Sequence, residues 1–173
     1  MKPNQRLTAG FFQRDVLDVA PDLLGKILVR RYSNQTIKRF MITEVEAYRG
    51  EEDLACHASK GRTPRTEVMY WSGGHIYVYL IYGIHYMLNF VTEREGIPQA
   101  ILIRGIDDII GPGRVSKILE IDMSHNQTDL LFSDDLWVED SVIKPEFKTS
   151  TRIGIDYAGE FWKNRPWRFI AQL

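Results

Sequence analysis

The sequence predicts an α+β fold, in which one mostly antiparallel, curved sheet is accompanied by peripheral helices. Two observations predict this class. Strand-like runs rich in tyrosine and β-branched residues follow one another through short turns, and short helical segments stand before and between them. The chain has 173 residues, of which 44% are hydrophobic, and this is enough for one domain with a substantial core. We therefore expect residues 1–173 to form a single domain.

The first part of the chain is predicted to form helices and then a hairpin. Pro21-Asp22 favours the start of a new helix, so two short helices are expected before the first strand. The turn residues Ser33-Asn34-Gln35 separate two strand-like runs. The elements expected here are helices at Arg14–Ala20 and Pro21–Leu28 and strands at Ile27–Tyr32 and Thr36–Glu46.

The second part of the chain is predicted to form another hairpin, a helix and a sheet edge. Tyr82-Gly83 interrupts two strand-like runs, which places a tyrosine at the hairpin tip. Trp162 and Trp167 require burial, so the tail is expected to belong to the same core. The elements expected here are strands at His75–Ile81, Tyr86–Thr92, Ala100–Arg104 and Leu136–Val138, a helix at Gly113–Ile121 and a sheet edge within Arg152–Ile170.

Charge is balanced overall and uneven along the chain. The net charge is −1, which counts against a protein that coats nucleic acid without sequence preference, because such proteins carry a surplus of basic residues. Basic residues nevertheless gather at Lys26–Arg39, Lys60–Arg65 and Lys163–Arg168, whereas acidic residues dominate Asp107–Glu146. If the basic segments share one face, the chain can bind DNA despite its neutral total.

Several function classes lack their sequence signals. Cys56 is the only cysteine, and no apolar run approaches the ~20 residues of a membrane span, so we expect a soluble cytoplasmic protein without disulfides. The four histidines form no close pair with this cysteine, and no glycine-rich Walker loop or dinucleotide fingerprint is present. We therefore expect neither a metal nor a cofactor.

Glu44 and Glu46 lie two residues apart on a predicted strand, so both side chains are expected on the same face of the sheet. A carboxylate on a strand is usually solvated at an edge. This strand is apolar, however, and a carboxylate in an apolar pocket gains basicity and becomes a suitable general base. Such a base could deprotonate a water that attacks a sugar carbon.

Aromatic and polar residues follow that strand. Tyr77 and Tyr79 are most simply one aromatic face packed on the core, and a lone His57 is most simply structural. Tyr82 is harder to explain in this way, because a large aromatic at an exposed tip lowers solubility. Asn89 stands in an apolar strand, where an amide must be paired, so it either ties a neighbouring loop or lines a pocket.

Four motifs together resemble the alkyladenine (3-methyladenine, or methylpurine) DNA glycosylase family, over most of the chain from about Asp22 onward. They are TEVEAYRGEEDLACHASKGRTPRTEVMY, IYVYLIYGIHYMLN, AILIRGI and STRIGIDYAGEFWKNRPWRF. The resemblance implies a DNA-intercalating β-hairpin that protrudes from the sheet. It also implies double-stranded DNA with damaged purines as the partner, and an enzyme of base excision repair.

The resemblance implies two catalytic residues. Glu46, in VEAY, matches the residue that activates the attacking water. Arg104, in LIRG, matches the arginine that helps to hold this water near the carboxylate. The resemblance supplies no lysine aimed at the sugar, so a monofunctional enzyme that leaves an abasic site is expected.

The remaining matches concern the base and the duplex. Tyr48 matches the aromatic residue on one face of the flipped base, and His57 and Tyr79 match those on the other face. Tyr82 corresponds to the side chain that fills the gap left in the duplex. Asn89 matches the asparagine that disfavours ordinary guanine by crowding its exocyclic amine.

Departures from the family pattern are few. Val45 and Cys56 replace small or polar neighbours common in the family, and both are expected near the pocket. The loop Thr92–Pro98 is expected to be longer than in vertebrate relatives. These departures leave the order of preference among 3-methyladenine, 7-methylguanine, hypoxanthine and ethenoadenine open.

Two other functions remain as alternatives at this point. A hydrolase of free nucleosides would need carboxylates that bind ribose and would not need a side chain that enters the duplex, so Tyr82 counts against it. A catalytically silent nucleic-acid-binding module would tolerate loss of Glu46 and Arg104, yet both are present. We expect the glycosylase to be a monomer, because the fold needs no partner to complete its core, and to be nucleoid-associated if bacterial.

Overall fold

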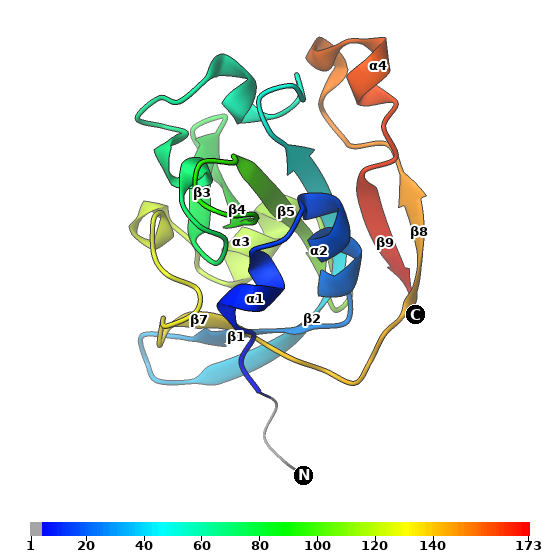
Figure 1. Ribbon diagram of the computed structural model, residues 1–173. Helices are drawn as coiled ribbons and strands as arrows, with labels where there is room; N and C mark the ends of the chain where they lie inside the picture. The colour runs from blue at the N-terminus through cyan, green and yellow to red at the C-terminus, as the bar shows by residue number, and fades with distance from the viewer. Residues whose placement is uncertain (1–4) are drawn as a thin grey trace.

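A curved, antiparallel sheet runs through the molecule (Figure 1). Its longest strand, β2, pairs with β1 near the start of the chain and with β9 near its end. The computed structural model describes residues 5–173 as one domain. All strand pairs are antiparallel, which confirms the predicted α+β class. The strands are β1 (Ile27–Arg31), β2 (Ile37–Arg49), β3 (Ile76–Ile81), β4 (His85–Val91), β5 (Gln99–Ile106), β6 (Ile109–Ile110), β7 (Leu136–Glu139), β8 (Glu146–Ser150) and β9 (Arg168–Gln172).

The helices are short and peripheral. The helices α1 and α2 lie in front of the sheet in Figure 1, and α4 lies beyond the strands β8 and β9. The α-helices are α1 (Ala9–Phe12), α2 (Val16–Leu23), α3 (Pro112–Ile118) and α4 (Glu160–Lys163). The 3-10 helices are η1 (His57–Lys60), η2 (Glu67–Tyr70), η3 (Met123–His125) and η4 (Asp156–Ala158). None of the helices in residues 5–173 combines the length and apolar character that a bilayer crossing requires.

Strand β2 uses both of its edges. Its first half pairs with β1, and its second half pairs with β5 on one side and with β9 on the other. The tail of the chain therefore adds β9 directly beside Glu44 and Glu46. A register irregularity at Glu44 accompanies the change of partner and bends the strand at this point.

The sheet has one apolar face and one mixed face. Alternate residues of β2 to β5 enter the main core with α1, α2 and α3, as side-chain alternation along strands requires. The residues of the opposite face form a smaller cluster with the loop that follows β2. The main core includes Val45, Ala47, Ile76, Val78, Leu88, Phe90, Ile101 and Ile103, and the smaller cluster includes Cys56, Ala58, Val68, Met69, Tyr70, Tyr77, Val91 and Ala100.

The predicted break at Pro21 is wrong, because one helix, α2, runs through this proline. Asp15 caps the helix by accepting a hydrogen bond from the backbone N–H of Leu17 at 2.9 Å. The proline removes only one intrahelical hydrogen bond near the end of the helix, while the apolar face of α2 is fully buried. The chain then turns at Gly25, where φ is +83°, so Ile27 and Leu28 belong to β1 and not to a helix.

The tail adds a strand to the sheet, but the sheet edge predicted within Arg152–Ile170 is wrong, because β9 lies between β2 and β8; the burial predicted for the tryptophans of the tail is only partial. Trp162 packs against a small cluster around Ala55, and Trp167 packs against the main core. Both indole rings are half-buried because they lie at the outer side of β9 with α4. The helix predicted at Gly113–Ile121 is shorter and corresponds to α3.

Gly73 lies just before β3 and packs closely against the end of α1. A Cβ atom at this position would lie 2.6 Å from the carbonyl oxygen of Phe12. We expect Gly73→Ala to lower the free energy of unfolding by about 1–3 kcal/mol, because the crowding atoms are backbone and cannot rotate away. Gly10→Ala is the matched control, since its nearest neighbour would be 3.9 Å away. Urea unfolding measures both. Equal stability of Gly73→Ala and the parent would contradict the expected clash.

Candidate active site

A row of side chains crosses the mixed face of the sheet from one edge to the other. Tyr77 on β3 pairs with Asn89 on β4, Asn89 pairs with Leu102 on β5, and Leu102 pairs with Glu46 on β2. Glu46 in turn pairs with Arg168 on β9. Directly paired residues share a face, so the strand register brings four polar residues, Tyr77, Asn89, Glu46 and Arg168, onto one surface.

Glu46 is the centre of this surface. Its side chain has no exposed area, and its two carboxylate oxygens have different partners. The Tyr48 hydroxyl donates to Oε2 at 2.8 Å, and the backbone N–H of Ile153 donates to Oε1 at 2.7 Å. Burial raises the pKa of Glu46 above its ordinary value, although Arg104 and these donors oppose the shift. The structure shows that Glu46 is buried, although its immediate partners are polar, and its role as a base stays a prediction.

Arg104 lies between two buried carboxylates. Its Nε donates to Oε1 of Glu44 at 3.1 Å and lies 3.6 Å from Oε1 of Glu46. Arg168 also donates to Oε1 of Glu44, at 3.1 Å. Glu44 and Glu46 are therefore on the same side of the strand, as expected, and Glu44 holds both guanidinium groups beside Glu46.

Three aromatic rings form a second group on the same face. Nδ1 of His57 lies 2.8 Å from the Tyr77 hydroxyl, and the ring centroids of His57 and Tyr79 are 4.5 Å apart. The rings of Tyr77 and Tyr79 lie 5.4 Å apart. Tyr77 thus packs in the core, as expected, and in addition fixes the orientation of His57. Sequence reasoning missed this second role, because only the fold shows which hydroxyl His57 reaches.

Burial and the nearby Arg65 lower the pKa of His57 to about 4. The imidazole is therefore neutral near pH 7 and presents an uncharged ring. Burial likewise keeps the Tyr48 phenol protonated by raising its pKa well above the ordinary value, so this hydroxyl can only donate to Glu46.

Arg152 supports Tyr48 from behind. Its guanidinium carbon lies 4.9 Å from the centroid of the Tyr48 ring and 5.0 Å from that of Trp167. It also forms a bidentate ion pair with Asp53, at 2.6 and 2.9 Å, and both side chains are completely buried. Arg152 immediately precedes Ile153, so the same ion pair holds the N–H that binds Glu46.

Asn89 and Tyr82 both belong to the β3–β4 hairpin. Asn89 is buried, and its Nδ2 donates to the carbonyl oxygens of Tyr77 and Met87 at 3.3 and 3.2 Å. The amide is therefore tied to its own hairpin, and within residues 5–173 its hydrogen bonds reach no neighbouring loop. Tyr82 lies at the tip between β3 and β4 with 85% of its surface exposed and a φ of +53°. The expected exposed tyrosine at a hairpin tip is confirmed.

The two departures noted in the sequence differ in their positions. Val45 belongs to the main core on the opposite face of the sheet, so the expectation that it lies near the pocket is wrong. It follows Glu44 on the strand and therefore points the other way. Cys56 packs with Tyr77 in the smaller cluster, and burial raises the pKa of its thiol to about 12. Within residues 5–173, no group of three or more His, Cys, Asp or Glu side chains is arranged to hold a metal ion.

A carboxylate of raised pKa beside an arginine, next to aromatic rings, indicates a hydrolase that acts on a flat, ring-bearing substrate. Comparison with known proteins identifies the family. The family described as "Methylpurine-DNA glycosylase (MPG)" matches residues 10–110 and 107–172. The chain belongs to the methylpurine-DNA glycosylase family, and it is a DNA glycosylase, a hydrolase of base excision repair.

Individual relatives agree over nearly the whole length. A protein of Sodalis glossinidius is 44% identical over 98% of this chain and 98% of its own length. A protein of Rickettsia felis is 44% identical over 93% of this chain and 90% of its own length, and one of Wolbachia pipientis wMel is 46% identical over 94% and 92%. Each carries the name "Putative 3-methyladenine DNA glycosylase".

We expect Arg152→Met to lower the free energy of unfolding by about 3–5 kcal/mol, because it leaves the Asp53 carboxylate buried without its counter-charge. Adding Asp53→Asn should restore part of the loss, since no charge then remains unpaired. Breaking the exposed pair of Arg14 and Asp22 by Arg14→Ala is the control and should cost about 0–1 kcal/mol. Urea unfolding of the parent and the three variants measures these changes. A double variant that is less stable than Arg152→Met would show that the unpaired carboxylate is not the cause of the loss.

We expect the His57 ring to stay neutral until the pH approaches 4. The unfolded chain binds this proton near pH 6.5, so between about pH 6.5 and 4 it holds more protons than the folded chain, and stability falls as the pH is lowered. Nuclear magnetic resonance of the imidazole protons measures the midpoint. A His57 midpoint near 6.5 would show that burial does not disfavour the cation.

Proposed function

We propose that this glycosylase hydrolyses the N-glycosidic bond of alkylated or damaged purines in double-stranded DNA and leaves an abasic site. The substrate class is 3-methyladenine first, with 7-methylguanine, hypoxanthine and ethenoadenine as further candidates. The names of the relatives support the first of these. The observation that carries the mechanism is the buried Glu46 with its raised pKa beside Arg104.

In the proposed reaction Glu46 is the general base. Each of its oxygens accepts one hydrogen bond from the described residues, so each retains a lone pair that a water can use. The water oxygen bonds to the anomeric carbon of the sugar and gives its proton to Glu46. The glycosidic bond breaks, and its electron pair stays with the purine nitrogen, which neutralises the positive charge of an alkylated base. The negative carboxylate also stabilises the oxocarbenium-like sugar, as in inverting sugar hydrolysis.

Arg104 is proposed to hold the attacking water. Its Nε is committed to Glu44, and its terminal nitrogens form no hydrogen bond to any residue in the described part of the chain. These N–H groups are therefore available to a water or to the sugar. Glu44 and Arg168 would act as positioning residues, because they fix the guanidinium without being expected to touch the substrate.

We propose that the flipped base lies between Tyr48 on one side and His57 and Tyr79 on the other. Ring contacts of a cationic purine contribute roughly 0.5–2 kcal/mol each. The low pKa of His57 supports this arrangement, because a charged imidazole would repel the cationic base. Asn89 is proposed to exclude ordinary guanine by crowding its amine, and its two bonds to backbone carbonyls keep it from moving aside.

Tyr82 is proposed to enter the duplex and fill the space that the flipped nucleotide leaves. Its exposure at the tip supports this role, because an exposed aromatic residue is otherwise unfavourable for solubility. Ile84, 69% exposed, lies beside it and extends the apolar tip. Extrusion costs a few kcal/mol and is cheapest at a weakened pair, so flipping would contribute to lesion selection.

The enzyme is proposed to be a monofunctional glycosylase and a monomer. It is proposed to act in the cytoplasm, at the nucleoid if the source is bacterial. The cations that contact Glu44 and Glu46 in the described residues are Arg104 and Arg168, and a guanidinium is not the lysine amine that a lyase needs as its nucleophile. The residues proposed to act on the base, Glu46, Arg104, Tyr48, His57 and Tyr79, all come from one chain, which supports a monomer.

Glu46→Gln should retain binding to a duplex that carries ethenoadenine or hypoxanthine and lose at least about 100-fold in excision rate, because the amide cannot accept the water proton. The duplex and methylated DNA are incubated with the protein, and strand breaks are counted before and after hot alkali. Glu95→Gln, an exposed change, is the matched control and should behave as the parent.

Strand breaks that appear only after alkali would support a monofunctional glycosylase. Excision by Glu46→Gln at the parental rate would show that the general base lies elsewhere. Intact binding by the parent protein without excision of any of these bases would instead favour a catalytically silent nucleic-acid-binding module.

A further inference from the structure

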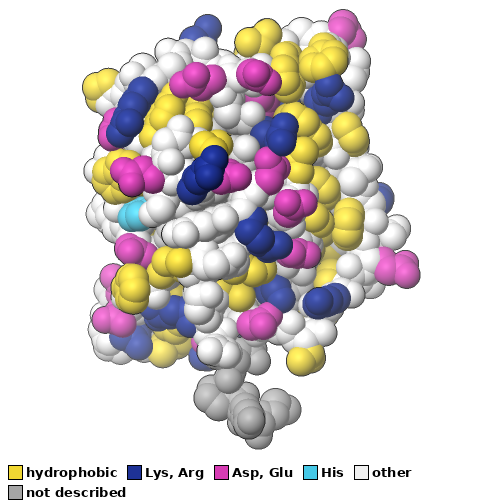
Figure 2. Space-filling model, in the orientation of Figure 1, with side chains coloured by type: hydrophobic (Ala, Val, Ile, Leu, Met, Phe, Trp, Pro, Cys, Tyr) yellow, Lys and Arg dark blue, Asp and Glu magenta, His cyan; other side chains and the backbone are white. Residues whose placement is uncertain are grey.

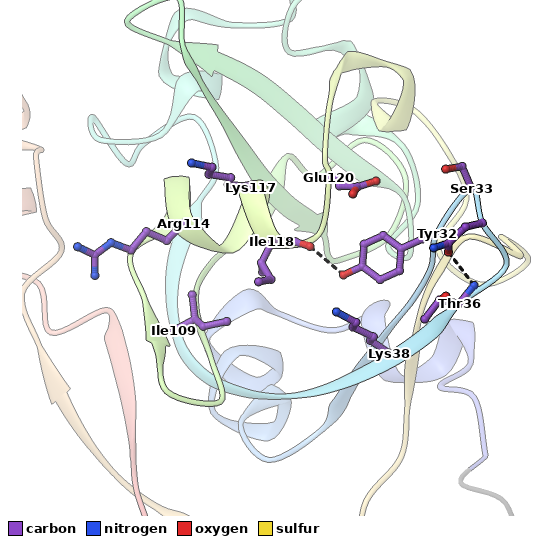
Figure 3. A pocket seen from close by; sticks show the side chains of 10 residues that line it. Tyr32, Ser33, Thr36, Lys38, Ile109, Arg114, Lys117, Ile118 and Glu120 are labelled. Atoms are coloured by element: carbon purple, nitrogen blue, oxygen red, sulfur yellow. Dashed lines mark hydrogen bonds between the residues drawn. The ribbon is translucent and has the colours of Figure 1, made fainter.

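A groove of about 590 Å³ lies between α3 and the turn that joins β1 to β2 (Figure 3). None of the residues proposed to act on the base lines it. Tyr32 and Ile118 form its apolar floor, and three cationic side chains border it. The residues that line the groove are Tyr32, Ser33, Asn34, Thr36, Lys38, Ile109, Arg114, Lys117, Ile118 and Glu120.

The walls of the groove are fixed to each other. The Tyr32 hydroxyl donates to the carbonyl oxygen of Ile118 at 2.8 Å, and Arg30 donates through Nε to that of Leu119 at 2.7 Å. Both carbonyls belong to the C-terminal end of α3, which would otherwise lack partners. These two hydrogen bonds tie the end of α3 to the β1–β2 hairpin, so the two walls of the groove are held together.

The cations of the groove have no acidic partner. Within residues 5–173, no carboxylate lies within 4 Å of Lys38, Arg114 or Lys117, and all three are exposed. Two basic neighbours in sequence differ in this respect. Lys26 pairs with Asp140 at 2.5 Å, and Arg39 pairs with Glu139 at 3.1 Å.

The folded chain thus neutralises part of its early basic segment and leaves the groove with a positive surplus. Glu120 is the only carboxylate that lines it, and Figure 3 shows this side chain at the end near Tyr32. By contrast, the face that carries α1 and α2 shows charged side chains of both signs interspersed (Figure 2).

The cations are spread out and do not converge. Arg114 and Lys117 extend from α3 to one side, whereas Lys38 reaches in from β2 on the other wall (Figure 3). The Lys38 ammonium lies 5.6 Å from the centroid of the Tyr32 ring. A compact anion would be held by converging donors, so this arrangement suits an extended chain of separate phosphates.

Helix α3, which forms one wall of the groove, begins against the hairpin that is proposed to enter the duplex. A Cβ at Gly113 would lie 3.1 Å from Nδ1 of His85, so α3 begins directly against the β3–β4 hairpin that carries Tyr82. The backbone N–H of Gly111 donates to the carbonyl oxygen of Arg104 at 2.8 Å. Helix α3 therefore connects the groove to the hairpin and to the candidate active site.

We propose that this groove binds the sugar–phosphate backbone of the duplex outside the lesion, with Arg114, Lys117 and Lys38 contacting phosphates. The inference rests on the proposed action on duplex DNA and extends it. Its role is sequence-independent holding: the contacts add affinity and fix the register of the duplex while Tyr82 enters it. They do not take part in breaking the glycosidic bond.

The test compares the parent protein with a triple variant, K38Q/R114Q/K117Q, by fluorescence anisotropy on a lesion-free 25-base-pair duplex at several salt concentrations. The slope of log affinity against log salt should fall by about 1 for each phosphate contact removed, so by about 3 in the triple variant. The affinity at low salt should weaken accordingly.

A second triple variant, R94Q/K144Q/K148Q, removes three exposed cations that have no ion pair in the described residues and lie outside the groove. It should keep the parental slope. Equal slopes for the groove variant and the parent, with unchanged thermal unfolding midpoints, would overturn the proposal. The excision rate at saturating protein should be the same in all three proteins. Loss of excision by the parent itself would speak against the proposed function, and the binding comparison would remain valid.

Discussion

The buried ion pair between Asp53 and Arg152 is the interaction on which the rest of the site depends. It joins the loop after β2 to the segment before η4, across 99 residues of sequence. Through it the Arg152 guanidinium lies behind the Tyr48 ring, and Ile153 is placed so that its N–H reaches Glu46. Asp53 also accepts from the N–H groups of its own loop, at Arg49 and Ala55, so its position is fixed from both sides. A buried pair of this kind contributes little net stability compared with apolar residues, and its value here lies in positioning.

Burial of the Glu46 carboxylate on the mixed face of the sheet costs stability, whereas burial of apolar side chains on the other face contributes it. Because the pKa of Glu46 is raised, the folded chain binds its proton more tightly than the unfolded chain, and stability falls as the pH rises from the ordinary pKa of a glutamate to the raised pKa of Glu46. The opposite face, with fully buried residues such as Val45, Phe90 and Ile103, compensates for this loss through its apolar core. The division of the sheet into an apolar face and a polar, aromatic face therefore separates stability from chemistry.

The sequence was informative wherever function depends on short-range spacing. Glu44 and Glu46 share a side of one strand, and Tyr82 stands at a turn between two strands, so both placements followed from local pattern. Long-range partners could not be predicted. Nothing near Asp53 in the sequence indicates that its counter-charge is Arg152, and nothing near Glu44 indicates Arg168. The helix break predicted at Pro21 was wrong because burial of the apolar face of α2 outweighs the one hydrogen bond that the proline removes. Tertiary packing of this kind cannot be seen in a local pattern.

The order of assembly along β2 has a consequence for the living cell. Chains emerge from the ribosome N-terminus first. The strand with Glu46 is therefore made long before Ile153 and β9, which supply its hydrogen-bond donor and its second neighbouring strand. Until those last residues are synthesised, the carboxylate has Tyr48 and Arg104 beside it but lacks the donor to its second oxygen and the strand β9. A nascent chain should thus be unable to remove bases, and truncation by premature termination should give a protein without this activity.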